Sequence, residues 1–188
     1  MDPRHSTAFT VRSNGGLLRV LITDCGVAPA IDVSRGTPAT PPVGTNFKAI
    51  WDTGASGCVI TQRVVDSCGL VATGMTVAHG VNSSGPCETY LVCLLLPHRV
   101  AFSSVRAIKG DLHGGADVLI GMDIITQGDF SVTNKGGVTV FSFRMPSELS
   151  TDYVQEHSTR MAKLAPPQPM RGFRPGHSPQ NPTGKKKK

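Results

Sequence analysis

The chain has 188 residues and a formal net charge of +6, with 39% hydrophobic and only 5% aromatic residues. This length accommodates one domain with tails, and 21 glycines and 14 prolines favour many short strands and turns over long helices. No apolar run approaches the roughly 18 residues that span a membrane, and the N-terminus lacks the apolar core of a secretory signal, so we expect neither a membrane protein nor a secreted one.

The five cysteines are an odd number and show no Cys-x-x-Cys spacing. A disulfide scaffold and a zinc site are therefore not indicated, and we expect a reducing, cytoplasmic environment. Most of the net charge lies in the C-terminal part, since residues 147–188 carry eight basic and three acidic residues. The basic balance therefore describes a tail rather than the fold.

The N-terminal third of the chain predicts strands and turns. Residues 7–23 read as two strands around the turn Asn14-Gly15-Gly16, whose residues tolerate positive φ. Residues 34–46 are rich in Pro, Gly, Thr and Ser and predict an exposed loop. Residues 47–61 follow as strand, turn and strand, and residues 61–70 allow one helical turn.

The middle of the chain predicts further strands. Residues 76–97 read as a hairpin around the polar tip 82–85, and residues 100–110 give one more strand. Residues 116–128 predict a strand that ends at Gly121 and a short helix that closes near Gly128, and residues 129–143 predict a hairpin.

The C-terminal part predicts a helix and a tail. Ser150 can cap a helix from Thr151 to about Leu164, and the Pro-rich, basic sequence beyond Ala165 is typical of disorder. We therefore expect one domain over residues 7–146, followed by the helix and tail in residues 147–188.

The stretch FKAIWDTGASGCVIT, from Phe47 to Thr61, places one carboxylate, Asp52, between two apolar segments. Burying an ionised carboxylate costs several kcal/mol unless it is paired or hydrogen-bonded. Small residues directly after the acid leave room for close approach of a ligand and a water molecule. The pattern indicates a functional acid, and the alternative is an ordinary hairpin turn, where Asp and Gly are also common.

A second element follows about 65 residues later, where the apolar sequence DVLIGMD runs from Asp117 to Asp123 and leads into the short helix. The order is strand, Asp-Thr-Gly-Ala, strand, hairpin, strand, apolar-Gly, helix and closing strand. Over roughly Val20 to Phe143, this order resembles the retropepsin-like aspartic proteases, the half-size members of the aspartic protease class, of a bacterial or cellular type.

The resemblance implies a mostly β fold, a closed, barrel-like retropepsin protomer with a flap hairpin and one short helix. It also implies roles for particular residues. Asp52 is the expected catalytic acid, and the expected active-site loop and substrate-binding residues are Thr53, Gly54, Ala55 and Ser56. The expected flap residues are Gly80, Val81, Asn82, Ser83, Ser84 and Gly85. The expected supporting residues are Ile120, Gly121, Met122 and Asp123.

Only one Asp-Thr-Gly sequence is present, so the resemblance implies a homodimer in which each chain supplies one Asp52. Two adjacent carboxylates would share a proton and activate a water molecule against a peptide bond, with no metal and no cofactor. The substrate would be a peptide or protein bound as an extended strand beneath the flap.

The sequence departs from the viral members of the family in three places. The first is a long insertion, residues 34–46. The second is a missing ion pair, because Ser56-Gly57 stand where viral members often carry acids and Met122 stands where the arginine that pairs with them would be. The third is that the dimerising termini are not recognisable, with GGVTVFSF, residues 136–143, as one candidate interface strand. These changes bear on substrate preference more than on fold. Asp123 and Asp129 are interpreted as helix-end and turn acids.

Two alternatives to an endopeptidase remain open from the sequence. The first is a non-catalytic peptide-binding or dimerisation module that keeps the fold. The second is a nucleic-acid contact through the basic tail, although four terminal lysines without aromatic residues are more typical of solvated charge.

Overall fold

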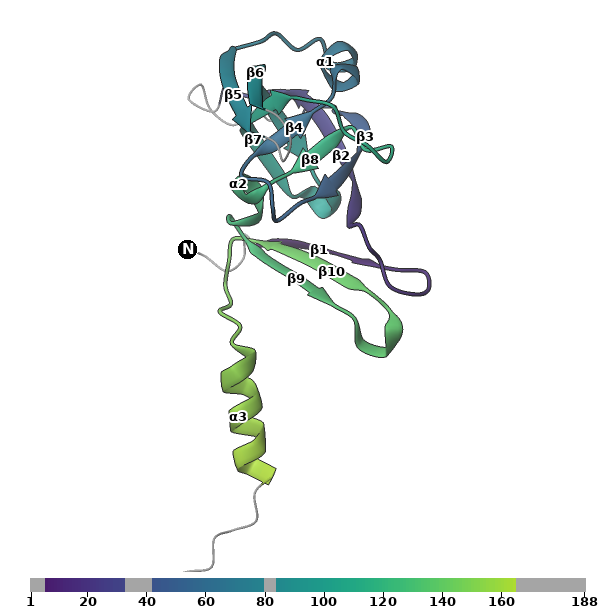
Figure 1. The fold of residues 1–188 in the computed structure, drawn as a ribbon, viewed down its shortest axis with the longest axis vertical. Helices are drawn as coiled ribbons and strands as arrows, with labels where there is room; N and C mark the ends of the chain where they lie inside the picture. Colours follow the sequence, from purple (N-terminus) through teal and green to yellow (C-terminus); the bar gives the residue numbers. More distant parts are fainter. Residues whose placement is uncertain (1–5, 33–41, 80–83, 165–188) are drawn as a thin grey trace, which may run out of the picture. The chain divides into compact units, whose positions relative to one another are not determined.

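The computed structural model describes residues 6–32, 42–79 and 84–164 (Figure 1). The chain divides into two compact units, one through Leu149 and one from Ser150 onward. The strands of the first unit are β1 (Thr7–Arg12), β2 (Ile22–Pro29), β3 (Thr45–Trp51), β4 (Cys58–Ile60), β5 (Gly74–His79), β6 (Ser84–Leu95), β7 (Ala101–Lys109), β8 (Val118–Ile120), β9 (Asp129–Thr133) and β10 (Val140–Met145). Its α-helices are α1 (Gln62–Cys68) and α2 (Met122–Ile125), and the second unit contains α3 (Tyr153–Leu164).

Six strands of the first unit form a closed barrel. Hydrogen bonds join them in the order β2, β3, β8, β4, β7 and β6, and an additional pairing of β2 with β6 closes the ring. Strand β5 pairs with β6 outside the ring and completes a hairpin. Alternation of buried and exposed residues, as in Phe47, Lys48 and Ala49 of β3, turns one face of each strand inward. The predicted mostly β, barrel-like fold is confirmed.

A smaller sheet of three strands, in the order β1, β10 and β9, lies beside the barrel near α2 (Figure 1). Its apolar face carries Phe9, Phe130, Phe141 and Phe143, which the strand registers place next to one another. All four rings lie within 6 Å of the Trp51 ring by centroid distance, at 5.1 to 5.9 Å. This aromatic cluster joins the small sheet to the end of barrel strand β3.

Several predicted elements differ from the structure in their partners or ends. Strands β1 and β2 lie on either side of the predicted turn at Asn14-Gly15-Gly16 along the chain but belong to different sheets. Helix α1 has seven residues, more than the single turn predicted, and ends at Gly69 in the left-handed region with φ of 59°. Part of the predicted loop, residues 33–41, and the hairpin tip, residues 80–83, lie outside the described residues.

Helix α3 begins at Tyr153, two residues later than predicted, and its cap is Asp152 rather than Ser150. The Asp152 carboxylate accepts hydrogen bonds from the backbone N–H groups of Val154 and Gln155, at 2.9 and 3.0 Å. The tail predicted to be disordered, residues 165–188, lies outside the described residues. Over the described part of the chain, no helix combines the length and the apolar character needed to cross a membrane.

Asp129, interpreted from the sequence as a turn acid, ties the segment after β10 back to the start of β9. Its carboxylate accepts hydrogen bonds from Arg144 Nε at 3.0 Å, from Ser147 Oγ at 2.6 Å and from the Glu148 N–H at 3.0 Å. The hydrogen bonds from Ser147, Glu148 and Arg144 hold the pKa of Asp129 well below its usual range. The ionised carboxylate therefore fixes the point at which the chain leaves the first unit.

Replacing Asp129 by Asn is expected to lower the free energy of unfolding in a pH-dependent way. Because the pKa is lowered in the folded state, the stabilisation from the charge is fully present above the usual aspartate pKa of about 3.9 and is lost as pH falls through the folded-state value. Urea unfolding at a series of pH values should give a constant difference from wild type between about pH 5 and 7 that shrinks below about pH 4. A difference that does not change with pH would contradict this role, and Asp24→Asn, in an exposed pair with Lys48, is the matched control.

Candidate active site

Asp52 directly follows Trp51, the last residue of β3. The position of Trp51 therefore fixes the position of the Asp52 backbone. Trp51 is 5% exposed, and its indole Nε1–H donates to the buried Thr23 Oγ1 at 3.0 Å. The Trp51 N–H donates to the Leu21 carbonyl, also at 3.0 Å. With the aromatic cluster on its other side, the indole is held by packing and by its one polar atom.

The carboxylate of Asp52 is half-buried at the start of a tight loop. Asp52 Oδ1 accepts the Gly54 N–H at 2.8 Å, and the Ala55 N–H donates to the Asp52 carbonyl at 3.3 Å. Thr53, Gly54 and Ser56 are exposed. Among the described residues, no cationic side chain pairs with Asp52. The Asp52 carboxylate is thus partly open to solvent, and the Gly54 N–H is the one donor that the described part of the chain offers it.

The loop is supported from behind by the segment that joins β8 to α2. Strand β8 lies between β3 and β4, the strands that enter and leave the loop, and pairs with both. The Asp52 N–H donates to the Ile120 carbonyl at 3.0 Å, and the Met122 N–H donates to the Ala55 carbonyl at 2.8 Å. A Cβ at Gly121 would lie 2.5 Å from the Gly57 carbonyl oxygen, so the two backbones can approach this closely only because Gly121 has no side chain. The predicted supporting residues therefore lie against the predicted loop.

The β5–β6 hairpin occupies the sequence position predicted for a flap. It is paired as far as His79 and Ser84, and most residues of β5 are exposed. Ser84 and Gly85, predicted as part of the hairpin tip, belong to β6, and Gly80 to Ser83 lie outside the described residues.

Two acids of the DVLIGMD segment make polar contacts near the loop that the sequence did not indicate. The Asp123 carboxylate, interpreted as a helix-end acid, accepts the Cys58 N–H and lies 3.2 Å from the Cys58 sulfur. Asp117, only 9% exposed, accepts hydrogen bonds from Thr61 Oγ1 at 3.2 Å and Arg63 Nη1 at 2.9 Å, which anchors the start of α1 to the start of β8. The sequence gives only a weak signal for these two contacts, namely that an acid stands directly before and directly after the VLIGM segment.

Burial raises the pKa of Cys58, and the Asp123 carboxylate next to it acts in the same direction, while a hydrogen bond with the Gly121 backbone opposes the increase. The thiol therefore stays protonated and serves as a hydrogen-bond donor. All five cysteines are free. Within the ranges that the structure describes, no three His, Cys, Asp or Glu side chains gather as a metal ion would require.

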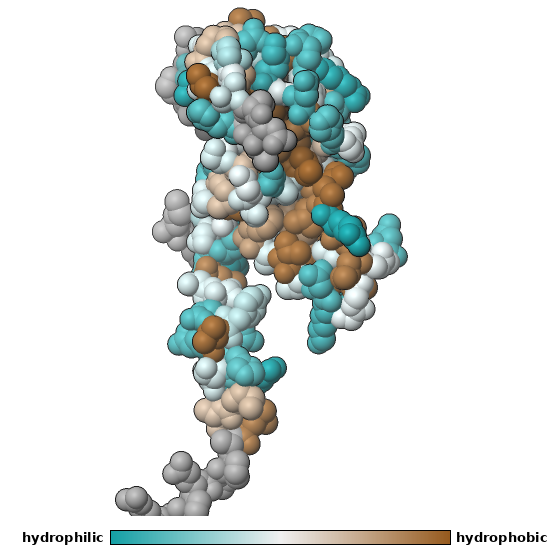
Figure 2. All heavy atoms as spheres, viewed as in Figure 1, coloured by the Kyte–Doolittle hydropathy of each residue, from teal (hydrophilic) through white to brown (hydrophobic). Residues whose placement is uncertain are grey.

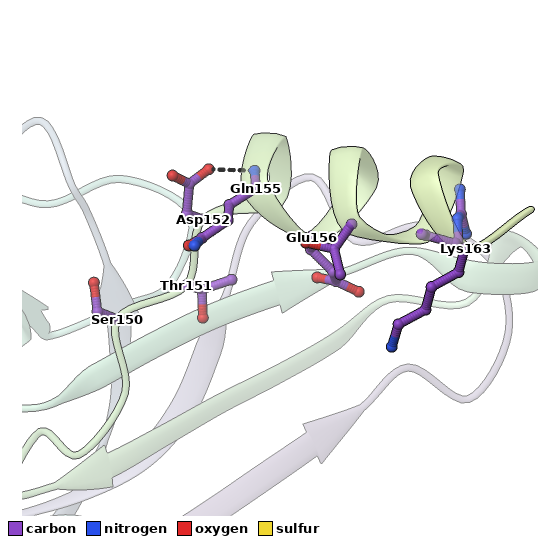
Figure 3. Close-up of a pocket in the computed structure, with 8 residues that line it drawn as sticks. Ser150, Thr151, Asp152, Gln155, Glu156 and Lys163 are labelled. Atoms are coloured by element: carbon purple, nitrogen blue, oxygen red, sulfur yellow. Dashed lines mark hydrogen bonds between the residues drawn. The ribbon is translucent and has the colours of Figure 1, made fainter. Parts of the chain in front are cut away.

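A shallow hollow also runs along α3, and Figure 3 shows its lining residues. These residues come from α3 and the three residues before Tyr153, so the hollow has no opposing wall. It has none of the geometry of a binding cleft, and the Asp152 cap described above accounts for its one marked hydrogen bond (Figure 3).

Comparison with protein families gives a match to the aspartyl protease family over residues 43–124. The predicted resemblance to the retropepsin-like aspartic proteases is confirmed. The matched region contains β3, the Asp52 loop, the hairpin and the β8–α2 segment, and the match supports a protease function. A search of curated protein sequences gave no match.

Among solved structures, a retropepsin-like aspartic protease from Rickettsia conorii is 12% identical, with 74% of this chain and 95% of that chain covered and a TM-score of 0.47. The EIAV protease in complex with the inhibitor HBY-793 is 17% identical, with coverages of 58% and 88% and a TM-score of 0.41. The retroviral protease-like domain of Ddi1 from Leishmania major is 19% identical, with coverages of 61% and 82% and a TM-score of 0.37.

Replacing Gly121 by Ala is expected to disrupt the support of the Asp52 loop. The new Cβ would meet the Gly57 backbone on one side, and a backbone shift of this kind costs at least about 2 kcal/mol. Urea unfolding followed by the fluorescence of Trp51, the only tryptophan, measures the loss. Gly74→Ala is the matched control, because its Cβ would make an ordinary 3.4 Å contact with Thr89 Oγ1. Equal losses in the two variants would show that the close approach is not what matters.

Proposed function

We propose that the chain is an aspartic endopeptidase whose active site forms at a homodimer interface, with one Asp-Thr-Gly loop from each chain. The catalytic domain would span residues 7–146, and residues 147–188 would lie outside the reaction. Asp52 is the proposed catalytic residue, and no metal or cofactor takes part. The five free cysteines fit the reducing, cytoplasmic setting expected for it.

The observation that carries this proposal is the setting of the Asp52 carboxylate. It is half-buried at the end of a rigid barrel strand, it accepts one hydrogen bond from Gly54, and small exposed residues surround it. Asp129, an acid with a structural role, accepts hydrogen bonds on both oxygens from Arg144 and the segment after β10. Among the described residues Asp52 accepts only the Gly54 N–H of its own turn, so its carboxylate keeps acceptor capacity for a further donor.

A second copy of the chain is the proposed partner because one loop supplies only one carboxylate. Exposed apolar side chains lie on the segment that leads into β2 and at the start of β2, the strand that pairs with β3: Leu17, Leu18, Val20 and Ile22. Val132 on β9 of the small sheet is exposed as well. Ile22 pairs in register with Ile50, two residues before Asp52. Figure 2 shows apolar surface running from the barrel towards the small sheet, where this segment lies. Burial of that surface against its symmetry mate would favour an isologous dimer.

The chemistry then follows from two carboxylates that are too close for both to ionise. They share one proton and titrate as a coupled pair. The ionised member takes a proton from a bound water while the water oxygen attacks the peptide carbonyl carbon, and the protonated member gives its proton to the carbonyl oxygen. The C–N bond of the tetrahedral intermediate then breaks: the member that took the water proton passes it to the leaving amine, and the other member takes a hydroxyl proton back, which leaves a carboxylic acid, an amine and the starting pair. Thr53 would brace the two loops, Gly54 would contact the substrate backbone, and the β5–β6 hairpin would cover an extended peptide.

Replacing Asp52 by Asn is expected to lower the rate of peptide cleavage at least about 100-fold, because the amide cannot accept the proton from water. The assay uses a peptide library at a series of values between about pH 4 and 7, because a shared proton makes cleavage depend on pH. Asp24→Asn, a change of the same kind at an exposed ion pair, should cleave like wild type. Unchanged cleavage by Asp52→Asn would remove Asp52 from the mechanism.

The dimer makes a separate prediction about mixtures of wild-type and Asp52→Asn chains. If the active site needs both Asp52 residues, an equal mixture after subunit exchange retains about one quarter of the wild-type activity, since only dimers of two wild-type chains work. An active site contained in one chain would retain about half. Sedimentation measured on the same mixtures shows whether the chains associate.

A non-catalytic peptide-binding module is the second candidate, favoured by the intact hairpin and barrel. It predicts that wild-type protein binds extended peptides without cleaving any, and that a statine-type transition-state mimic has no inhibitory effect.

A nucleic-acid contact through the basic tail is the third candidate. It predicts nucleic-acid binding that weakens steeply with salt and disappears when residues 172–188 are deleted.

A further inference from the structure

Three contacts fasten the Asp52 loop to the segment from Ile120 to Asp123, one at each stage of the loop. The Asp52 N–H meets the Ile120 carbonyl at the near end, and the Ala55 carbonyl meets the Met122 N–H in the middle, at 3.0 and 2.8 Å. At the far end, the Cys58 N–H meets Asp123 Oδ2 at 3.2 Å. The first two contacts are made between backbone atoms, whereas the third depends on a side chain.

The Asp123 carboxylate is well placed for this third contact. Its Oδ1 atom accepts the Ile124 N–H at 3.0 Å, which orients the carboxylate on the first turn of α2. The same oxygen lies 3.2 Å from the Cys58 sulfur, which is 2% exposed and donates its proton. Both oxygens thus contact Cys58, one through its backbone and one through its side chain.

Backbone pairing does not supply this contact in another way. The antiparallel pairing of β4 with β8 begins at Val59 and Leu119, one residue after Cys58. The parallel pairing of β4 with β7 includes Cys58, opposite Ala107, but the Cys58 N–H makes its hydrogen bond to Asp123. The backbones of Gly57 and Gly121 are already in contact, so the loop cannot move closer to α2 to find a carbonyl acceptor. A buried N–H without an acceptor is costly, and a charged acceptor makes a stronger hydrogen bond than a neutral one.

We propose that Asp123 is a positioning residue that holds the far end of the aspartyl protease loop in place through its contacts with Cys58. It touches neither Asp52 nor the expected peptide, and it acts by keeping the loop closed on α2. Its importance for cleavage rests on the function proposed above, whereas its effect on the loop does not.

Thiol labelling tests the proposal directly, because Cys58 is itself the residue that the Asp123 carboxylate contacts. In Asp123→Ala, alkylation of Cys58 under native conditions is expected to be at least about tenfold faster than in wild type. Cys25 on β2 and Cys93 on β6 are equally buried and serve as references within the same molecule. Their labelling rates, measured peptide by peptide by mass spectrometry, should stay near the wild-type values.

Asp123→Asn is the matched control for charge. It removes the negative charge beside the thiol but keeps one oxygen that can accept the Cys58 N–H. If the loop opens when the acceptor is lost, Cys58 labels faster in the Ala variant than in the Asn variant. Equal rates in the two variants would mean that the charge alone governs thiol reactivity, and the proposal would be overturned.

Two further outcomes would also overturn it. A parallel rise in the labelling of Cys58, Cys25 and Cys93 would show that Asp123 supports the whole barrel rather than the loop. Unchanged labelling of Cys58 in Asp123→Ala would show that the carboxylate does not hold the loop at all.

Kinetics on the same preparations separate this proposal from the proposed function. With cleavage established, Asp123→Ala should lower kcat at least about tenfold with little change in KM, and Asp123→Asn should recover part of the loss. Asp52→Asn should lose cleavage while Cys58 labels as in wild type. If wild-type protein cleaves no peptide, the proposed endopeptidase fails, but the labelling result still decides the role of Asp123.

Discussion

The rest of the structure depends on how the Trp51 indole is packed and hydrogen-bonded. Its ring packs against four phenylalanines of the small sheet, and its one polar hydrogen is satisfied by Thr23 inside the barrel. The next residue is Asp52. Cores are close-packed, and Trp51 cannot shift without opening a void. The start of the Asp52 loop is therefore held in place by both sheets.

The second constraint is the narrow space behind the loop. Strands β3 and β4 flank β8, so the chain must leave β3, turn and return within six residues over the start of α2. Contact between the Gly57 and Gly121 backbones makes this turn tight enough to be held by the Ile120 and Met122 backbones. The missing side chain of Gly121 therefore allows close packing behind the loop, while Thr53, Gly54 and Ser56 of the loop itself stay exposed.

Local patterns predicted the elements, but not their partners. Alternation and turn residues indicated the strands that became β3, β6 and β7, and the glycine after VLI marked the end of β8. The pairing of β1 with β10 could not be read from the turn at Asn14, because Thr7 meets Met145 across nearly the whole domain. Asp123 and Asp129 looked like local turn and helix-end acids because their donors come from distant parts of the chain.

The sequence by itself determined the chemistry available, a single Asp-Thr-Gly loop between apolar strands and a glycine that later supports it. Those features are local, and they follow from which residues fit a tight buried turn. Only the tertiary structure decided that β1, β10 and β9 hold Trp51, that Asp123 reaches Cys58, and that apolar side chains remain exposed beside the loop. These depend on which strands pair and pack across the fold, and no short stretch of sequence contains that information.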